Sequence, residues 1–367
     1  MEIESKPVAN NLQKPKTNGH NPPVIDLYRP GPASQIAMML RGSEITREKV
    51  FSVLEHAGSE TRIPDDFLQN IDTRQLEELL KHAQTITFKV RKCRQDLHLM
   101  DLSRLVDSSL KGNRADCHGN PIERAKVETG IAFVYTEKPN TGIIFTEYER
   151  GTAHDTRSIL QESANGRGPA VSLFRKILPV TYISRNVKIQ GALLQGWGCP
   201  TFIDGNVGSK TTEIKMAVVK ADIFTFVVPK TVVESKKHKL WAVDITDRVN
   251  SIIEKSDKRY RHLYVGTPHT TVFIASERFE HNDYIRDTEE IIAPRGNHYK
   301  HNRTAKDTNG RAHLAAAFGG NYNMYQLNEN GRLDLGPNRI WLVECDPRTN
   351  EDGTTETRDR EVIIGLL

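Results

Sequence analysis

Cysteine is scarce in this chain of 367 residues. No two cysteines form a CxxC pair, and the four are Cys93, Cys117, Cys199 and Cys345. Zinc sites built on thiolates use closely spaced pairs, and secreted domains held together by disulfides contain far more cysteine. The scarcity therefore argues against both kinds of site. It favours a reducing compartment, so we expect a cytoplasmic protein.

Long apolar segments are also missing. No run of 18 apolar residues occurs, whereas a membrane-spanning helix needs about 20. Residues 1–23 are polar and lack the apolar stretch of a secretory signal. We therefore expect neither a membrane span nor a cleaved leader.

A strong excess of one charge is missing as well. The 51 lysine and arginine residues nearly balance the 47 aspartate and glutamate residues, which leaves a formal net charge of +4. Proteins that bind nucleic acids gather basic side chains on one surface and often add aromatic stacking motifs. Neither pattern is visible in this sequence, so we expect no nucleic-acid partner.

The organisation of the chain changes twice along its length. Residues 1–30 are rich in Asn, Pro, Lys and Gly, which predicts a disordered tail, and residues 31–84 carry helical patterns that predict a helical extension. From residue 85 onward, short β-branched and aromatic runs alternate with turn residues, which predicts an α+β fold. The predicted strands are 86–90, 130–135, 142–147, 239–245, 261–266, 270–276 and 339–344, and the clearest helix is Asp283–Ile292.

An internal repeat divides this α+β region into residues 85–221 and 222–367. TITFKV…LHLMDLSRLV resembles IFTFVV…LWAVDITDRV, which places Asp101 opposite Asp244. ERGTAHDTRS (149–158) similarly resembles ERFEHNDYIRD (277–287), and KIQGALLQG (188–196) resembles RAHLAAAFGG (311–320). We interpret this sequence similarity as a sign of a duplicated domain. The alternative is that both halves are rich in strand-forming residues without common ancestry.

Three histidines of the second half, His269, His301 and His313, lie in distinctive surroundings. No helical spacing links them, so only the fold could bring them together. Neutral imidazoles can bind a divalent metal ion, and imidazoles also act as acid and base near neutral pH. Taken singly, each could equally be a hydrogen-bonded or an exposed histidine.

The second half resembles the YjbQ-like family in the order and spacing of its motifs. The matching elements are Asp244-Ile245-Thr246, His269-Thr270-Thr271, Asp283 with Arg286 and Asp287, Tyr299 with His301-Asn302, Asn309 with Ala312-His313-Leu314, Gly331-Arg332-Leu333 with Leu335-Gly336, and Glu344 with Asp346 and Arg348. The resemblance implies tandem YjbQ-like domains, each with two packed β-sheets and one or two helices, behind the N-terminal helical extension. It also implies a homo-oligomer, usually a trimer.

The same resemblance implies a small pocket where the histidines converge on an anion or a divalent metal ion. Its expected members fall into three roles. We expect His269, His301, His313 and Asp287 to be catalytic, Thr270, Arg286, Asn302 and Arg348 to bind substrate, and His269, His301 and His313 to hold the metal ion. For Arg286 and Asp287, a solvated pair on a helix is the competing interpretation.

The first half departs further from the family pattern. It has Lys138-Pro139-Asn140-Thr141 in place of His269-Thr270-Thr271, so we expect it to be degenerate and structural, standing in for a neighbouring subunit or shaping the rim of the pocket. The second half also departs, because Arg311 replaces the family's aspartate and Pro337-Asn338-Arg339 replaces its T-W-Q. These changes adjoin the expected pocket and put the ancestral substrate in doubt.

Two functions are compatible with this sequence. The first is an enzyme with transferase or lyase/cyclase-type chemistry on a small, phosphorylated substrate, as the family's secondary thiamine-phosphate synthase activity implies, or a repurposed activity in specialised metabolism. The second is a non-catalytic binding or scaffold protein that kept the fold. Loss of turnover on replacing the histidines, with the fold intact, would distinguish them.

Overall fold

A computed structural model defines the architecture of most of the chain. The segments that it describes are residues 27–41, 43–60, 73–91, 97–111, 129–138, 140–147, 149–162, 171, 173–183, 198–205, 211–233, 241–256, 258–277, 288, 290–296, 298–305 and 307–367. Most of the predicted tail and most of the predicted helix Asp283–Ile292 lie outside these residues. Arg286, Asp287 and residues 188–196 also lie outside them.

The N-terminal extension is helical, as predicted, and it begins earlier than expected. Leu27 and Tyr28, which we had assigned to the tail, are buried because they pack into the main core. The Tyr28 hydroxyl lies 2.9 Å from His262 Nδ1 in the second half. The helices of the extension are α2 (Pro32–Met39), α3 (Arg47–Glu60) and α5 (Thr73–Lys81).

The first half forms two antiparallel sheets, ordered β1-β7-β3-β5 and β2-β6-β4. Its apolar runs become strands because their β-branched and aromatic side chains fill the space between sheet and helix. The elements are β1 (Gln84–Arg91), β2 (His98–Asp101), α6 (Ser103–Lys111), β3 (Thr129–Tyr135), β4 (Thr141–Thr146), α7 (Arg150–Glu162), β5 (Ile177–Ile183), β6 (Cys199–Asp204) and β7 (Thr211–Lys220).

The second half forms two larger antiparallel sheets, ordered β13-β11-β17-β8 and β10-β14-β12, and a small one, β15-β16-β9. The combination of antiparallel sheets and helices in the described residues confirms the α+β class. The elements are β8 (Asp222–Val228), β9 (Val232–Val233), β10 (Trp241–Asp244), α8 (Thr246–Glu254), β11 (His262–Gly266), β12 (Val272–Glu277), α10 (His301–Thr304), α11 (Gly310–Gly319), β13 (Tyr322–Gln326), β14 (Arg339–Glu344), β15 (Arg348–Thr349), β16 (Thr355–Glu356) and β17 (Arg360–Leu366).

The two halves share one strand order and one hydrogen-bond register. Asp101 pairs with Thr201 at the end of β2, and Asp244 pairs with Trp341 at the equivalent point of β10. Each aspartate then accepts a hydrogen bond from the backbone nitrogen two residues later, at 2.7 Å for Asp101 and 2.9 Å for Asp244. The predicted equivalence of these two residues agrees with the geometry. Common ancestry of the halves stays a prediction.

One segment of the proposed repeat is wrong. We aligned residues 188–196 with residues 311–320, but the first segment follows β5 in the chain. The second forms α11 and precedes β13, which is the equivalent of β5 in the shared sheet order. The order of the elements therefore does not place residues 188–196 opposite helix α11.

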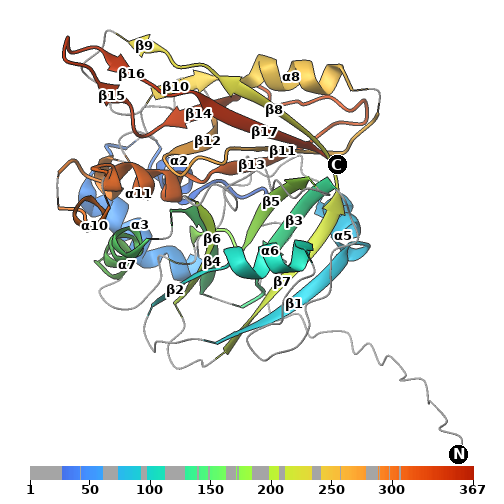
Figure 1. The fold of residues 1–367 in the computed structure, drawn as a ribbon, viewed down its shortest axis with the longest axis horizontal. Helices are drawn as coiled ribbons and strands as arrows, with labels where there is room; N and C mark the ends of the chain where they lie inside the picture. The colour runs from blue at the N-terminus through green and yellow to red at the C-terminus, as the bar shows by residue number, and fades with distance from the viewer. Residues whose placement is uncertain are drawn as a thin grey trace, which may run out of the picture.

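The halves pack against each other through their four-stranded sheets, one below and one above in Figure 1. Tyr322 and Met324 of the second half belong to the same buried cluster as Phe133 of the first half. The buried guanidinium of Arg175 crosses this junction, because its nitrogens bond the Tyr322 carbonyl oxygen at 2.5 Å and the Asn323 Oδ1 atom at 2.6 Å. The junction is therefore built like a protein core.

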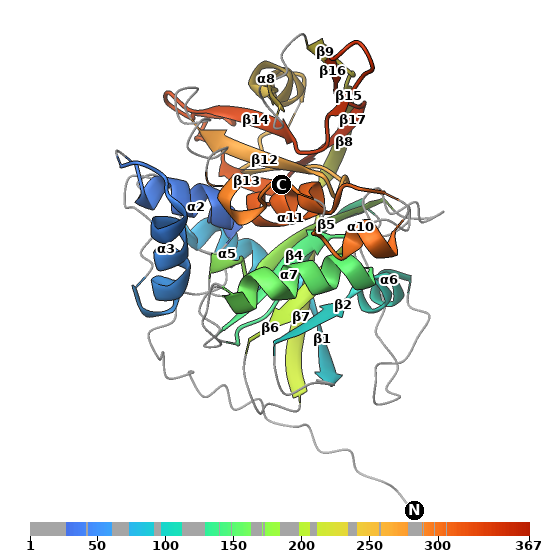
Figure 2. The same ribbon diagram turned by 90° about the vertical axis from the view of Figure 1, so that its left-hand side faces the viewer.

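Three helices gather at one edge of the junction. Figure 2 shows α7 of the first half below α11 and beside α10 of the second half. These helices pack on one another, and α11 also packs on β4 and β12. No helix in the portion of the chain that the structure describes is long and apolar enough to cross a membrane.

Candidate functional site between the two halves

Small residues allow α7, α10 and α11 to approach closely. A Cβ atom on Gly151 of α7 would lie 2.4 Å from the Cα atom of His301, so only glycine fits there. A Cβ atom on Gly319 of α11 would lie 2.3 Å from the ring of Phe273. Helix α11 is buried on every side, which explains why its sequence, GRAHLAAAFG, has no polar face.

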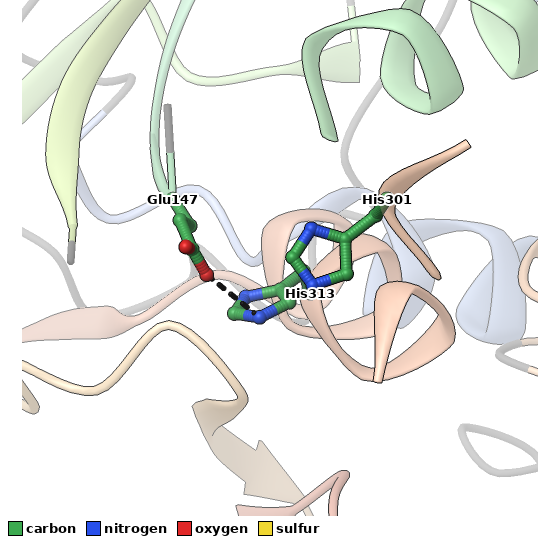
Figure 3. Close-up of side chains that lie close together, drawn as sticks. All are labelled: Glu147, His301 and His313. Atoms are coloured by element: carbon green, nitrogen blue, oxygen red, sulfur yellow. Dashed lines mark ion pairs between the residues drawn. The ribbon is translucent and has the colours of Figure 1, made fainter. Parts of the chain in front are cut away.

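His301 and His313 meet in this buried junction. Their ring centroids lie 4.8 Å apart at an interplanar angle of 61°, and their exposed fractions are 1% and 3%. His313 Nε2 lies 2.9 Å from an oxygen of Glu147, which follows β4 of the first half, as Figure 3 shows. One donor atom from each of these three residues lies within 4.8 Å of the others.

The hydrogen bonds of His301 fix the proton on one of its ring nitrogens. Asn309 Nδ2 donates to Asp346 at 3.2 Å, and a carboxylate of this kind only accepts. The Asn309 Oδ1 atom therefore faces His301 Nε2, at 3.0 Å, and this nitrogen must carry the proton. The other nitrogen, Nδ1, lies 2.9 Å from Glu149 Oε1 and 3.0 Å from the Thr152 hydroxyl.

Glu149 is ionised in this arrangement. Burial acts to raise its pKa, but hydrogen bonds from the Gly151 backbone, the His301 ring and the Thr152 backbone outweigh burial and lower the pKa to about 2. The Glu149 carboxylate therefore carries its negative charge beside His301 Nδ1.

Another carboxylate of the first half holds α10 in place. The two oxygens of Asp155 accept hydrogen bonds from the backbone nitrogens of Lys300 at 2.8 Å and His301 at 3.0 Å. Helix α7 thus supplies the acceptors that the first turn of α10 would otherwise lack. The position of His301 depends on the first half of the chain.

Of the three expected histidines, the structure brings His301 and His313 together and leaves out a third, His269. This residue lies in the turn before β12, where its Nε2 accepts a hydrogen bond from the Glu361 backbone at 3.0 Å. Burial, together with the charges of Arg360 and Arg358, lowers its pKa to about 4. His269 is not a member of the group of close donor atoms, and Glu147 takes its place.

The other expected site residues fall in different places. Asn302 has a structural contact, because its Oδ1 accepts a hydrogen bond from the Gly310 nitrogen at 2.9 Å. Thr270 is buried next to His269, and Arg348 is exposed on β15, where its backbone pairs with Glu356. The structure does not bring Arg348 to the two histidines.

Sequence reasoning missed Glu147 and Glu149, since both lie in the half that we expected to be structural. The signal that could have found them was the segment ERGTAHDTRS (149–158), which stood out in the repeat and also contains Thr152 and Asp155. Chemistry-bearing residues in a supposedly degenerate copy pointed to a site shared between the halves.

The donor set at this junction fits a transition-metal ion in kind. Two imidazoles and one carboxylate are common zinc ligands, and three protein ligands leave a position open for a substrate. The His313 nitrogen that faces Glu147 is Nε2, so this nitrogen and the Glu147 carboxylate are the donor atoms that the pair could offer to one ion. The 4.8 Å spread exceeds the edge of about 3.4 Å expected for tetrahedral zinc, so binding would draw the ligands inward.

The sequence of the second half matches a known family. Residues 230–367 match the model described as UPF0047 protein YjbQ-like. This match covers the C-terminal region of the chain. The match does not extend into residues 85–221, so the tandem arrangement rests on the shared sheet order alone.

Several solved structures are similar to part of this chain. A "YbjQ-like protein of unknown function" from Sulfolobus solfataricus P2 is 24% identical, with a TM-score of 0.33, and the match covers 40% of this chain and 98% of that one. A hypothetical protein from Aeropyrum pernix K1 is 26% identical, with a TM-score of 0.32 and the same coverage of 40% and 98%. No curated protein matches the chain.

Proposed function

We propose that this protein is an enzyme acting on a small molecule at the histidine centre, which we define as Glu147, Glu149, His301 and His313. One observation carries the proposal. Two nearly fully buried histidines of the YjbQ-like half are each paired with a glutamate of the other half, at 2.9 Å in both cases. Buried titratable groups held at hydrogen-bond distance are typical of catalytic sites.

The arrangement suits proton transfer and stabilisation of a leaving group. His301, with a proton on Nε2 and the Glu149 carboxylate at Nδ1, is held as a proton donor. Glu147 orients His313, whose Nδ1 has no partner among the described residues and can accept a proton. Reactions that displace pyrophosphate, such as thiamine phosphate formation, need this kind of positioned donor.

A divalent metal ion would be held by Glu147, His301 and His313. When bound, such an ion supplies a Lewis acid that stabilises developing negative charge. His301 would have to exchange a hydrogen bond for the ion, because both of its nitrogens already have protein partners. Glu149 or Asn309, whichever kept its hydrogen bond to the other nitrogen, would then orient the ring.

The same observation favours the second candidate, a scaffold in which the histidines only fasten the halves together. Every hydrogen-bonding atom of the His301 ring is satisfied by the protein, as in a structural contact. His313 does not fit this alternative as well, since its Nδ1 is left unpaired within the described residues.

Calorimetric titration with zinc chloride, supported by elemental analysis of the purified protein, tests the metal-bound form. We expect one equivalent to bind, and we expect His313→Ala and Glu147→Gln to weaken binding at least tenfold while circular dichroism stays unchanged. His154→Ala is the matched control, because this histidine lies on α7 with its side chain 57% exposed. Equal binding by all four proteins would contradict the proposed ligands.

Turnover separates the enzyme from the scaffold. Release of pyrophosphate from a pyrimidine pyrophosphate and a thiazole phosphate should be abolished in His301→Ala and His313→Ala and kept in His154→Ala. Absence of metal binding, and of turnover on these and related phosphorylated substrates, would favour the scaffold. The substrate, the oligomeric state and the cellular location stay predictions.

A further inference from the structure

Arg311, in the first turn of α11, is a buried cation, and two of its three guanidinium nitrogens have no hydrogen-bond partner among the described residues. Its exposed fraction is 8%. Its Nε and Nη2 atoms are both buried, and neither has a hydrogen-bond partner in the segments that the structure describes. Burying an unpaired charge costs several kcal/mol, so proteins normally pair a guanidinium in this position.

The two unpaired atoms form one edge of the guanidinium. Nε and Nη2 point their hydrogens in parallel, and this fork matches two oxygens of a carboxylate or phosphate group. Arg360 of the same chain shows the match, because its Nε and Nη2 atoms bond the two oxygens of Glu344, the second at 2.6 Å. The equivalent edge of Arg311 is open.

Asp155, an acid near this region, already has hydrogen-bond partners. Burial raises the pKa of Tyr299, while the charge of Arg311 acts to lower it and that of Asp155 to raise it, which places both residues near the same tyrosine. The Asp155 oxygens accept hydrogen bonds from the Lys300 and His301 backbones. Asp155 therefore holds α10 and forms no ion pair with Arg311.

A second donor without a partner lies on the facing helix. Thr156 of α7 is fully buried, and its hydroxyl makes no hydrogen bond in the described segments of the chain, although a helical threonine usually bonds a backbone carbonyl of the preceding turn. Helices α7 and α11 pack on each other. Each of these two packed helices thus carries a buried polar side chain with unpaired atoms among the described residues.

We propose that Arg311 anchors a binding site for a small oxyanion of the phosphate class at the junction of α7 and α11. Arg311 and His313 are two residues apart and so leave the helix on different faces. The oxyanion site is therefore separate from the histidine centre. The site is built on Arg311, the residue that replaces the aspartate of the YjbQ-like pattern.

Thermal unfolding in inorganic phosphate and in pyrophosphate, at ionic strength matched with sodium chloride, tests the site. We expect the midpoint of the unmodified protein to rise and saturate with either anion. Arg311→Met should lose the response, with affinity at least tenfold weaker by calorimetry. Arg303→Met is the control, since Arg303 is exposed on α10 and should leave the response unchanged.

A second readout keeps the test decisive. In buffer without phosphate, Arg311→Met should be at least as stable as the unmodified protein, because the substitution removes an unpaired buried charge. No response of the unmodified protein to either anion, an equal response of the Met variant, or a lower midpoint for that variant without phosphate would each overturn the proposal. Zinc binding by Arg311→Met should persist, so failure of this site is distinguishable from failure of the histidine centre.

Discussion

The first and second halves place a buried acid at the same point of equivalent sheets. Asp204 lies between His98 and Thr141 in the register of β2-β6-β4, and Glu344 lies between Trp241 and Val272 in the register of β10-β14-β12. Both side chains are almost fully buried, with exposed fractions of 1% and 3%. The halves thus keep the same architecture around different chemistry.

The partners of these acids differ. The Nε and Nη2 atoms of Arg360 donate hydrogen bonds to the two carboxylate oxygens of Glu344. Nη2 also donates to the Thr271 hydroxyl at 3.1 Å. Asp204 accepts a hydrogen bond from the Thr212 hydroxyl at 3.1 Å and lies 3.5 Å from Lys138 Nζ. A bidentate ion pair in one half corresponds to a looser contact in the other.

Lys138 occupies the position of His269. The backbone nitrogen of Lys138 donates to the Thr136 hydroxyl, and that of His269 donates to the Thr267 hydroxyl, at 3.2 and 3.4 Å. This geometry agrees with the sequence alignment of the two segments. The first half has no histidine there, yet it supplies both glutamates of the histidine centre. The second half therefore supplies the two imidazoles of the centre, and the first half supplies the two carboxylates that contact them.

Replacing the cationic partner of Glu344 should have the largest effect on stability, and replacing that of Asp204 should have a much smaller one. Arg360→Met leaves Glu344 buried and uncompensated, and we expect a loss of about 3–5 kcal/mol in the free energy of unfolding. Lys138→Met should cost about 1 kcal/mol, because the Lys138 side chain is 25% exposed and Asp204 keeps Thr212. Urea denaturation measures both. Equal losses would break the comparison.

Removing the guanidinium that joins the halves should have the next largest effect. Arg175→Met removes the hydrogen bonds that the guanidinium donates to the Tyr322 carbonyl and to Asn323, and we expect a loss of about 2–4 kcal/mol. The control Arg150→Met changes an exposed residue of α7 and should stay within about 0.5 kcal/mol. Urea denaturation of both variants checks the difference. A neutral Arg175→Met would mean that the junction does not depend on this contact.

Acid sensitivity should lie in the second half. Burial, assisted by nearby arginines, lowers the pKa of His262 and of His269 to about 4, whereas both titrate near 6.5 in the unfolded chain. Between pH 4 and pH 6.5 the unfolded state therefore binds more protons than the folded state. The two histidines do not reduce the free energy of unfolding above pH 6.5, and they reduce it progressively as the pH drops toward 4. The equivalent residues of the first half are Ile131 and Lys138, so that half has no histidine at either position.

The variant His269→Gln should flatten this pH dependence by up to about 1.4 kcal/mol per pH unit, less for the partial exposure of the ring. Midpoints of urea denaturation between pH 4 and pH 7 give the slope. The exposed His154→Gln is the control and should leave the slope unchanged. An unaltered slope in His269→Gln would contradict the lowered pKa.

The smallest expected effects come from the paired aspartates that precede α6 and α8. Asp101→Ala and Asp244→Ala each remove an acceptor for a backbone nitrogen, and each should cost about 1 kcal/mol. The cost should be slightly larger for Asp244, which also pairs with Arg339. A negligible effect of one with a clear effect of the other would show that the halves use the position differently.

Much of the fold could be predicted from the sequence, because strand signals are local. The run 339–344 became β14 without a change of boundary, and the D-I-T motif located Asp244 at the end of its strand. The YjbQ-like resemblance located His301 and His313 correctly as neighbours. These features depend on residues that are close in the sequence or that follow one order of motifs.

The remaining features of the site depend on packing between the halves. No sequence spacing predicts that Glu147 reaches His313, since the contact exists only when β4 packs against α11. The position of His269 was equally out of reach, because a backbone nitrogen of β17 holds its ring. A hydrogen bond donated by a backbone nitrogen cannot be predicted from the type of residue that carries it.

A double-mutant cycle between Glu147→Gln and His313→Gln tests most directly whether the two halves build one centre. Free energies of unfolding for the two single variants and the double variant, from urea denaturation at pH 7, give the coupling energy. We predict a coupling of at least about 1 kcal/mol, as for contacting buried groups. Losses that add within about 0.3 kcal/mol would contradict the account, because the glutamate of one half and the imidazole of the other would then act independently.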